Sequence, residues 1–95
     1  MVAQAASQQM EDSDSGGTPY GYTWDGDGGE HIVYWASDGH VWEIFKTSFD
    51  WSTWNSNDLT AATGATNPVS DPHAYFWYGE NIVYFAVDGL WKIER

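Results

Sequence analysis

Residues 32–39 read Ile32-Val33-Tyr34-Trp35-Ala36-Ser37-Asp38-Gly39, and fifty residues later the chain reads Ile82-Val83-Tyr84-Phe85-Ala86-Val87-Asp88-Gly89. The chain therefore contains an internal repeat. A period of this length, carried by short runs of aromatic and β-branched residues, is typical of a β-propeller blade rather than of a helical solenoid. Two blades are too few to close a propeller, so we expect copies of the chain, or sequence outside it, to complete the ring.

The repeat extends on both sides of this stretch, because residues 19–24 align with 72–77 and residues 41–44 align with 90–93. The intervening segments differ in length, as turns tolerate. The β-branched and aromatic content predicts six strands, at residues 20–24, 31–36, 41–47, 74–77, 81–86 and 90–94. The pairs Asp38-Gly39 and Asp88-Gly89 supply the positive φ angles that two-residue hairpin turns need.

We predict an all-β fold of about two four-stranded antiparallel β-propeller blades per chain, with the ring closed by oligomerisation. Residues 19–71 form the first blade repeat, and residues 72–95 form a second, incomplete one. Residues 1–7 can be read as a strand that completes a neighbouring blade and covers its edge. Residues 8–18 read as a flexible acidic linker. The segment 59–64 fits one helical turn capped by Asn57 or Asp58, an outer strand or a packed loop.

Composition excludes several classes of partner. Fourteen acidic residues against three basic ones give a net charge of −11, which argues against binding to a phosphate backbone. The chain has no cysteine to form disulfides, so at 95 residues we expect a homo-oligomer to supply stability. No stretch approaches the ~20 apolar residues of a membrane span, and no signal peptide is visible. We expect a soluble protein without nucleic-acid or membrane partners, and we leave its compartment open.

Seven tryptophans and six tyrosines are the main functional signal. Aromatic rings stack on the C–H faces of sugars, while polar neighbours bond the hydroxyl groups. Trp51 and Trp54 lie in a polar stretch and are expected to be exposed. Trp42 and Trp91 recur in register, which favours core packing for both. Trp35 has Phe85 as its counterpart, which fits either a paired cleft or plain packing. The candidate ligand-binding residues are Trp24, Trp35, Trp54, Asn57, Asp58 and Trp77.

The sequence predicts no metal, no other cofactor and no catalytic residues. The loop Asp25–Glu30 resembles a calcium loop, but it lacks the spacing of an EF-hand, and a solvated hairpin loop is favoured. His31, His40 and His73 lack the spacing of a zinc site. The repeated Asp-Gly pairs are explained by turn chemistry rather than by acid-base catalysis. We therefore expect a non-enzymatic protein.

The chain resembles blades of bacterial β-propeller lectins of the Photorhabdus fucose-binding type over most of residues 19–94. The resemblance is carried by Gly21-Tyr22-Thr23-Trp24, His31-Ile32-Val33-Tyr34, Ser37-Asp38-Gly39-His40-Val41, Trp54-Asn55-Ser56-Asn57-Asp58-Leu59-Thr60 and Asp71-Pro72. It implies pockets between neighbouring four-stranded blades that bind fucose or methylated sugars. It also implies a plan like that of small fucose lectins, which close a six-bladed ring as trimers of two-bladed subunits.

For this chain, the resemblance implies a fucose-like or methylated glycan as partner. Trp54, Asn57 and Asp58 would form one wall of the site, and Trp24 or Trp77 of an adjacent blade would offer the stacking face. The alternative is a structural, self-assembling propeller fragment with no small-molecule ligand, because propeller folds host unrelated functions.

Overall fold

The structure is a computed structural model that describes residues 17–24, 28–47 and 50–94. Three sequence predictions fall wholly or mainly outside these residues. They are the strand at residues 1–7, most of the acidic linker at residues 8–18, and the calcium-like carboxylates of residues 25–27.

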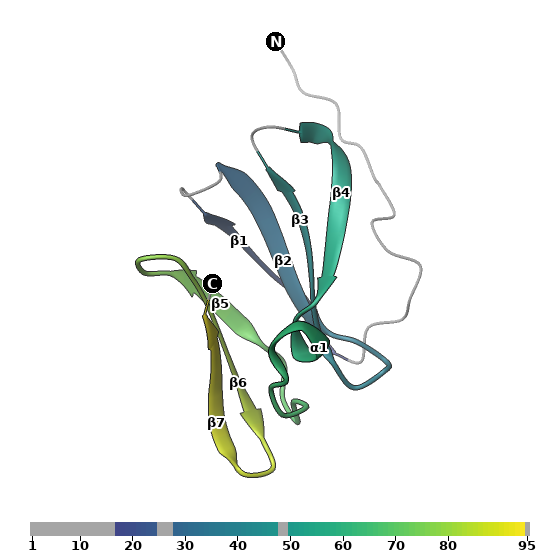
Figure 1. The fold of residues 1–95 in the computed structure, drawn as a ribbon, viewed down its shortest axis with the longest axis vertical. Coiled ribbons are helices and arrows are strands. Elements are labelled where there is room, and N and C mark those ends of the chain that lie inside the picture. Colours follow the sequence, from purple (N-terminus) through teal and green to yellow (C-terminus); the bar gives the residue numbers. More distant parts are fainter. Residues whose placement is uncertain (1–16, 25–27, 48–49, 95) are drawn as a thin grey trace.

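The described chain forms two antiparallel sheets that lie beside each other (Figure 1). The first sheet has the order β1 (Tyr20–Trp24), β2 (Gly29–Trp35), β3 (Val41–Thr47) and β4 (Asp50–Asp58). A short helix, α1 (Leu59–Thr63), follows it. The second sheet has the order β5 (His73–Phe76), β6 (Glu80–Ala86) and β7 (Gly89–Glu94). The predicted all-β class is confirmed, although the second sheet has three strands in the described residues rather than four.

The repeat seen in the sequence is also a repeat of hydrogen-bonding register. Val33 lies opposite Tyr20 and Glu43, and Val83 lies opposite His73 and Lys92. Because each pair of neighbours aligns in sequence, the hairpins β1–β2–β3 and β5–β6–β7 are two versions of one unit. Strand β1 runs beside β5, so the same strand of each unit lies at the junction of the sheets.

The repeated glycines adopt the positive φ angles expected of them, with 88° at Gly39 and 129° at Gly89. The second hairpin has a two-residue turn, but Val87 and Asp88 form it rather than the predicted pair Asp88-Gly89, because Ala86 pairs with Gly89. The two-residue prediction is wrong for the first hairpin, because the N–H of Ala36 donates to the carbonyl of His40 over 2.9 Å and encloses a three-residue loop. The positive φ of Gly39 is the conformation that the common three-residue hairpin requires of its last loop residue.

Strand β4 and helix α1 occupy the polar segment that follows the first unit. Sequence analysis predicted no strand at β4, because Asn and Asp, which recur in this segment, have low strand propensity. The segment becomes a strand by pairing with β3, with a register shift between Phe45 and Thr47. The helical alternative for residues 59–64 is confirmed: Asp58 accepts a hydrogen bond from the N–H of Ala61, and Gly64 ends the helix at a φ of 71°.

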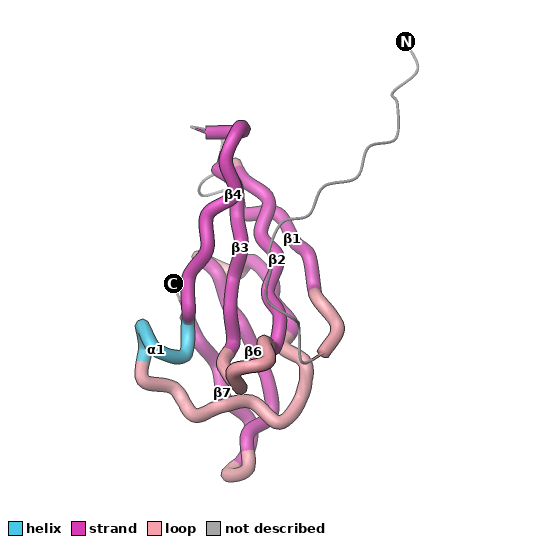
Figure 2. Tube along the Cα trace, turned by 90° about the vertical axis from the view of Figure 1, so that its right-hand side faces the viewer, coloured by secondary structure: helices cyan, strands magenta, loops and turns pink. Residues whose placement is uncertain are grey.

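The main core lies between the sheets, which face each other in Figures 1 and 2. We call the side of each sheet that carries Val33 or its counterpart Val83 the front face, and the opposite side the back face. Since side chains alternate along a strand, the back face of the second sheet carries Ile82 and Tyr84. The front face of the first sheet packs on this back face, and the shared core comprises Val33, Val41, Leu59, Ala74, Ile82, Tyr84, Ala86 and Ile93.

A second apolar cluster lies on the back face of the first sheet. Tyr34, Ala36 and Ile44 are its buried members, and Ile32, Trp42 and Trp54 pack against them. The first sheet therefore carries buried apolar residues on both of its faces. Among the described residues, α1 is far too short to cross a bilayer, and no other helix is formed.

Candidate functional site

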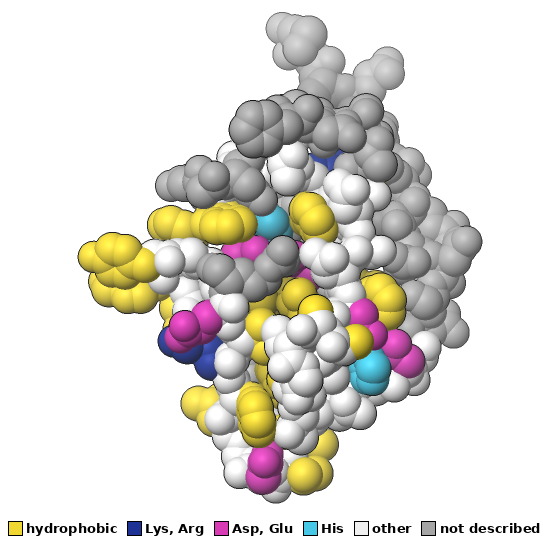
Figure 3. Space-filling view, viewed as in Figure 1, with side chains coloured by type: hydrophobic (Ala, Val, Ile, Leu, Met, Phe, Trp, Pro, Cys, Tyr) yellow, Lys and Arg dark blue, Asp and Glu magenta, His cyan; other side chains and the backbone are white. Residues whose placement is uncertain are grey.

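An aromatic hairpin tip stands out at the end of the second sheet. Trp77 and Tyr78 connect β5 to β6, with 67 % and 92 % of their surfaces exposed, and their rings make an edge-on contact with centroids 5.1 Å apart. Adjacent exposed apolar side chains mark interaction sites more often than single ones do. Figure 3 shows hydrophobic side chains protruding from this side of the molecule. The tip is therefore a candidate contact surface.

The backbone of the tip is held in an uncommon conformation. Tyr78 has a φ of 52°, and among the described residues it is the one non-glycine with a positive φ. This region disfavours residues with a Cβ atom, and a glycine here would be free of that cost. The buried Asn81 amide fixes the turn by donating to the carbonyls of Trp77 and Gly79, at 3.0 and 3.1 Å. The structure thus displays a strained tyrosine where a glycine would be easier.

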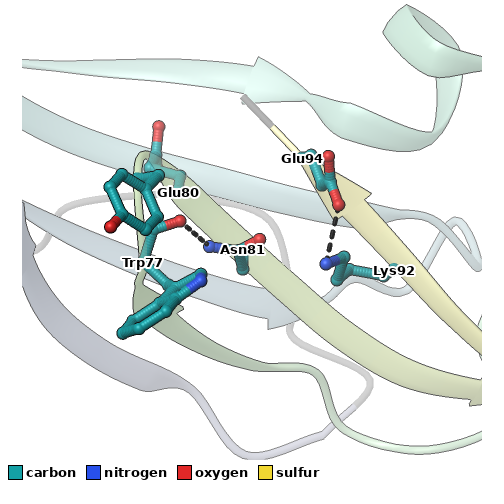
Figure 4. Close-up of a pocket in the computed structure, with 6 residues that line it drawn as sticks. Trp77, Glu80, Asn81, Lys92 and Glu94 are labelled. Carbon is teal, nitrogen blue, oxygen red and sulfur yellow. Dashed lines mark hydrogen bonds and ion pairs between the residues drawn. The ribbon is translucent and has the colours of Figure 1, made fainter.

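A hollow of about 540 Å³ opens beside the tip (Figure 4). Asn81, Lys92 and Glu94 line it together with the tip aromatics and with Glu80, which is buried. Lys92 and Glu94 form an ion pair of 2.6 Å along β7. The volume of the hollow falls within the usual range of small-molecule sites. The hollow combines an aromatic wall with the Asn81 amide, the Lys92 ammonium and the Glu94 carboxylate, which is the chemistry that recognises a polyhydroxylated ring.

A second polar group is closed off between the sheets. His31 and Glu43 from the first sheet and Glu80 from the second are 2 %, 0 % and 1 % exposed. The His31 Nδ1 atom lies 3.2 Å from Glu43 Oε2 and 3.4 Å from Glu80 Oε2. The Tyr22 hydroxyl donates to Glu43 over 3.0 Å and also bonds to Glu80. We call these four residues the carboxyl cluster.

Strand register builds the carboxyl cluster. Tyr22 lies opposite His31, and His31 lies opposite Phe45, so the three rings point to the front face. The His31 ring is stacked between those of Tyr22 and Phe45, with centroid separations of 5.3 and 5.6 Å. Stacking fixes the ring so that its nitrogen meets the carboxylates. The cluster thereby joins the two sheets through polar contacts as well as through the apolar core.

Burial changes the acidity of this cluster. Loss of hydration raises the pKa of Glu80 to about 7, and the hydrogen bond with Glu43 contributes in the same direction. Burial and the neighbouring carboxylates raise the pKa of Tyr22 well above its usual range. Two carboxyl groups this close are most stable when they share a proton. His31, Glu43 and Glu80 also have the donor atoms and proximity of a metal-binding group. The hydrogen bonds within the cluster, through which the carboxyl groups share a proton, are enough to explain why these groups can be buried without a metal ion.

Trp54, Asn57 and Asp58 do not form the single wall predicted from the sequence. Residues 54 and 58 lie on one face of β4, and residue 57 lies on the other, opposite Glu43. Trp54 is half-buried rather than exposed, with the Lys46 ammonium 4.7 Å from its ring centroid. Its indole nitrogen is buried without a hydrogen-bond partner among the described residues. The side chain of Trp51 lies outside the description.

Asp58 caps helix α1 and bonds to His40. Its Oδ1 accepts from the N–H of Ala61 over 3.0 Å, and its Oδ2 lies 2.7 Å from His40 Nδ1. The bond to Asp58 raises the pKa of His40. Asp38 joins the same group and accepts a 2.9 Å hydrogen bond from the Trp42 indole. This arrangement secures the start of α1 and the neighbouring turn.

The remaining predicted tryptophans separate into two environments. Trp24 and Trp35 are half-buried, and the Trp24 ring contacts those of His31 and Phe76, with centroids 5.8 and 6.5 Å away. Trp77, the counterpart of Trp24, is exposed and lines the hollow at the hairpin tip. Of the six predicted ligand-binding residues, the hollow at the tip contains Trp77, while Trp54 lines a separate hollow of about 370 Å³ on the back face of the first sheet.

Sequence analysis missed the carboxyl cluster and the contribution of Tyr78, Asn81 and Lys92. One signal was available. Glu43 alternates with Val41 and Phe45 on a strand face that is otherwise apolar, which indicates a buried charge with a partner. The partner Glu80 comes from the other sheet, and only the packing of the sheets brings it there.

The chain matches no protein-family model, no curated protein and no solved structure.

Proposed function

We propose that this protein is a non-enzymatic, lectin-like carbohydrate-binding module of the β-propeller type, assembled from several copies of the chain. The observation that carries the proposal is the hollow at the hairpin tip, where exposed Trp77 stands beside Asn81, Lys92 and Glu94. An aromatic face suits the apolar side of a fucose-like or methylated sugar, and the polar side chains suit its hydroxyl groups.

The conformation of the tip supports this proposal. Tyr78 holds a positive φ that glycine would adopt at lower cost, yet it keeps a ring in contact with that of Trp77. Strained residues persist where the surrounding structure or a function requires them. The Asn81 amide holds the tip in place before any ligand arrives, which lowers the entropic cost of binding.

Several copies in one assembly would hold several such sites together. Single shallow sites bind sugars weakly, and linked sites gain avidity because later contacts are intramolecular. The repeat in the sheets fits an assembly of propeller blades, because β1 and β5 occupy equivalent places and run side by side. This is the arrangement expected of neighbouring blades around an axis.

The test is binding of the wild type and of Trp77→Ala to an array of fucosylated and O-methylated glycans. We expect the variant to lose at least about tenfold in affinity, equivalent to about 1.4 kcal/mol. Val87→Ala is the matched control, because Val87 is also an exposed apolar residue at a hairpin of the second sheet, but it does not line the hollow. Equal binding by Trp77→Ala and wild type would refute the site.

A structural, self-assembling role is the second candidate, and a different observation favours it. The front face of the second sheet exposes Phe85 and Leu90 by 58 % and 68 %. An apolar face of this kind is typical of protein contacts. A wild-type assembly that binds no glycan on the array would favour this role over the lectin-like one.

A further inference from the structure

The second sheet ends in an open edge. Its strand order is β5, β6 and β7, so β7 pairs with β6 on one side and with no described strand on the other. In the first sheet the counterpart of β7 is β3, and β4 pairs with the equivalent side of that strand. Figure 1 shows β7 as the outermost strand of the second sheet. The place that β4 fills in the first unit is therefore open among the described residues of the second.

The backbone of β7 directs hydrogen-bonding groups to this edge. Both backbone groups of Phe85 bond to the segment 69–70, over 2.9 and 2.7 Å. Phe85 therefore bonds away from β7, and its neighbour Leu90 belongs to a pair without hydrogen bonds. Such pairs alternate with bonded ones along an antiparallel ladder, so Lys92 and Glu94 also direct their N–H and C=O groups away from β6.

The edge of β7 has few of the features that prevent strand addition. The strand pairs with β6 without interruption from Gly89 to Glu94 and contains no proline. Its lysine, Lys92, is paired with Glu94 at 2.6 Å. By contrast, β4 at the edge of the first sheet shows a register shift against β3 and is rich in Asp and Asn. Regular edges accept a further strand more readily than irregular, polar ones do.

We infer that β7 pairs antiparallel with β7 of a second copy, with Lys92 of each chain opposite Glu94 of the other. The two second sheets then become one continuous sheet. This inference rests on the assembly named in the proposed function and identifies a strand that carries it. The contact is isologous, because the same strand serves both copies, so it joins the copies in pairs.

The charges of β7 select the register. Only residues with outward backbone groups form hydrogen-bonded pairs across the new junction, which restricts those pairs to Leu90, Lys92 and Glu94. A register with Lys92 opposite Lys92 would set two ammonium groups against each other, and like charges in directly opposite positions are destabilising. The register with Lys92 opposite Glu94 joins opposite charges twice and brings the two Ile93 residues together at the twofold axis.

This self-complementarity is the reason why the occupant is a second copy. The chain carries a net charge of −11, so two copies repel each other over much of their surfaces. Strand β7 has one basic and one acidic residue and is locally neutral. Its edge therefore offers two copies a place of approach without local repulsion, and the order of its charges matches only when the two strands run in opposite directions.

Charge reversal tests the contact by analytical ultracentrifugation. Lys92→Glu and Glu94→Lys each place like charges at both cross-strand pairs, so each should raise the dimer dissociation constant at least fivefold. An equal mixture of the two variants should regain most of the affinity as a heterodimer, because opposite charges then meet at both pairs. Glu30→Lys, a reversal at an exposed position of the first sheet, is the control and should leave dimerisation unchanged.

The mixture separates a contact between copies from an effect within one chain. Both variants lose the ion pair within β7, and mixing cannot restore it. Recovery in the mixture therefore supports pairing between chains. A mixture as monomeric as its components, a wild type that is monomeric, or reversals that leave the dimer unaffected would refute the contact.

Disulfide formation tests the register in a chain that has no cysteine of its own. Lys92→Cys and Glu94→Cys are prepared separately, mixed and oxidised. Directly opposite residues of a hydrogen-bonded pair have Cα atoms about 5.5 Å apart, which a disulfide spans. We expect a covalent heterodimer in the mixture. A disulfide formed mainly by Lys92→Cys alone would overturn the register. Both tests omit sugar, so loss of glycan binding by a protein that still dimerises would reject the lectin-like role alone.

Discussion

Tyr22 of the first sheet and Glu80 of the second are joined by a hydrogen bond across the interface between the sheets. The same hydroxyl donates to Glu43, so one proton donor lies between two buried carboxyl groups. Burying carboxylates is costly unless they are paired or protonated. The interface between the two repeat units is thus sensitive to protonation, and two predictions rest on it.

Glu80→Gln should make stability less dependent on pH. Burial raises the pKa of Glu80 from 4.5 to about 7, so the folded chain keeps a proton that the unfolded chain releases. A raised carboxyl pKa makes the wild type lose stability as pH rises from 4.5 to about 7. At about 1.4 kcal/mol per pH unit, the loss is about 3 kcal/mol. Glutamine removes this contribution.

Urea unfolding between pH 4 and 8, at one fixed protein concentration, checks this prediction, since assembly alone shifts apparent stability. Relative to the wild type, the free energy of unfolding of Glu80→Gln should rise across the interval. Glu94→Gln is the control, because it also replaces a carboxylate of the second sheet, but an exposed one. Parallel pH profiles for Glu80→Gln and wild type would show that Glu80 does not titrate in this range.

Tyr22→Phe should destabilise the junction and change its pH response. The variant removes the hydroxyl that bonds to both carboxyl groups, and a buried polar group left unsatisfied costs about 1–3 kcal/mol. The hydrogen bond from Tyr22 lowers the pKa of Glu80, so its loss should raise that pKa further. The pH at which stability levels off should therefore move upward. Tyr20→Phe is the matched control on the same strand.

Residue alternation and repeat alignment predicted the strands of both units, because register follows from which residues share a face. The positive φ angles of the turn glycines were predictable for a different reason, since few residues other than glycine adopt them. Strand β4 was not predicted, because pairing with β3 overrides the low strand propensity of its Asp and Asn residues. The wall of Trp54, Asn57 and Asp58 was wrong because, once the segment is a strand, neighbours in sequence point to opposite faces.

Contacts between residues far apart in the chain were the other feature that the sequence could not predict. Trp24 and Trp77 are equivalent in the repeat, and composition offered no way to tell them apart. Their environments differ because the second sheet covers Trp24, whereas Trp77 lies on an outer face. A repeat predicts which residues are counterparts, and only the packing of the sheets shows which counterpart remains accessible.

Tyr78→Gly should separate stability from ligand binding. Glycine adopts the φ of 52° found at this position without steric cost, so relief of strain should stabilise the fold by about 1 kcal/mol. Loss of the ring that contacts Trp77 should weaken glycan binding. Thermal unfolding and the glycan array measure the two effects. A variant that binds glycans as well as the wild type would show that the Tyr78 ring does not contribute to glycan binding.

Asp58→Ala should lower stability and leave glycan binding nearly unchanged. The variant removes the N-cap of α1 and the partner of His40, and loss of an N-cap costs about 0.5–2 kcal/mol. Because Asp58 does not line the hollow beside Trp77, glycan affinity of the folded variant should stay within about twofold of wild type. Asp58→Asn, which keeps a capping oxygen, should recover most of the stability. Affinity that falls for both variants while the fold is intact would return Asp58 to the binding site and place the sugar near α1.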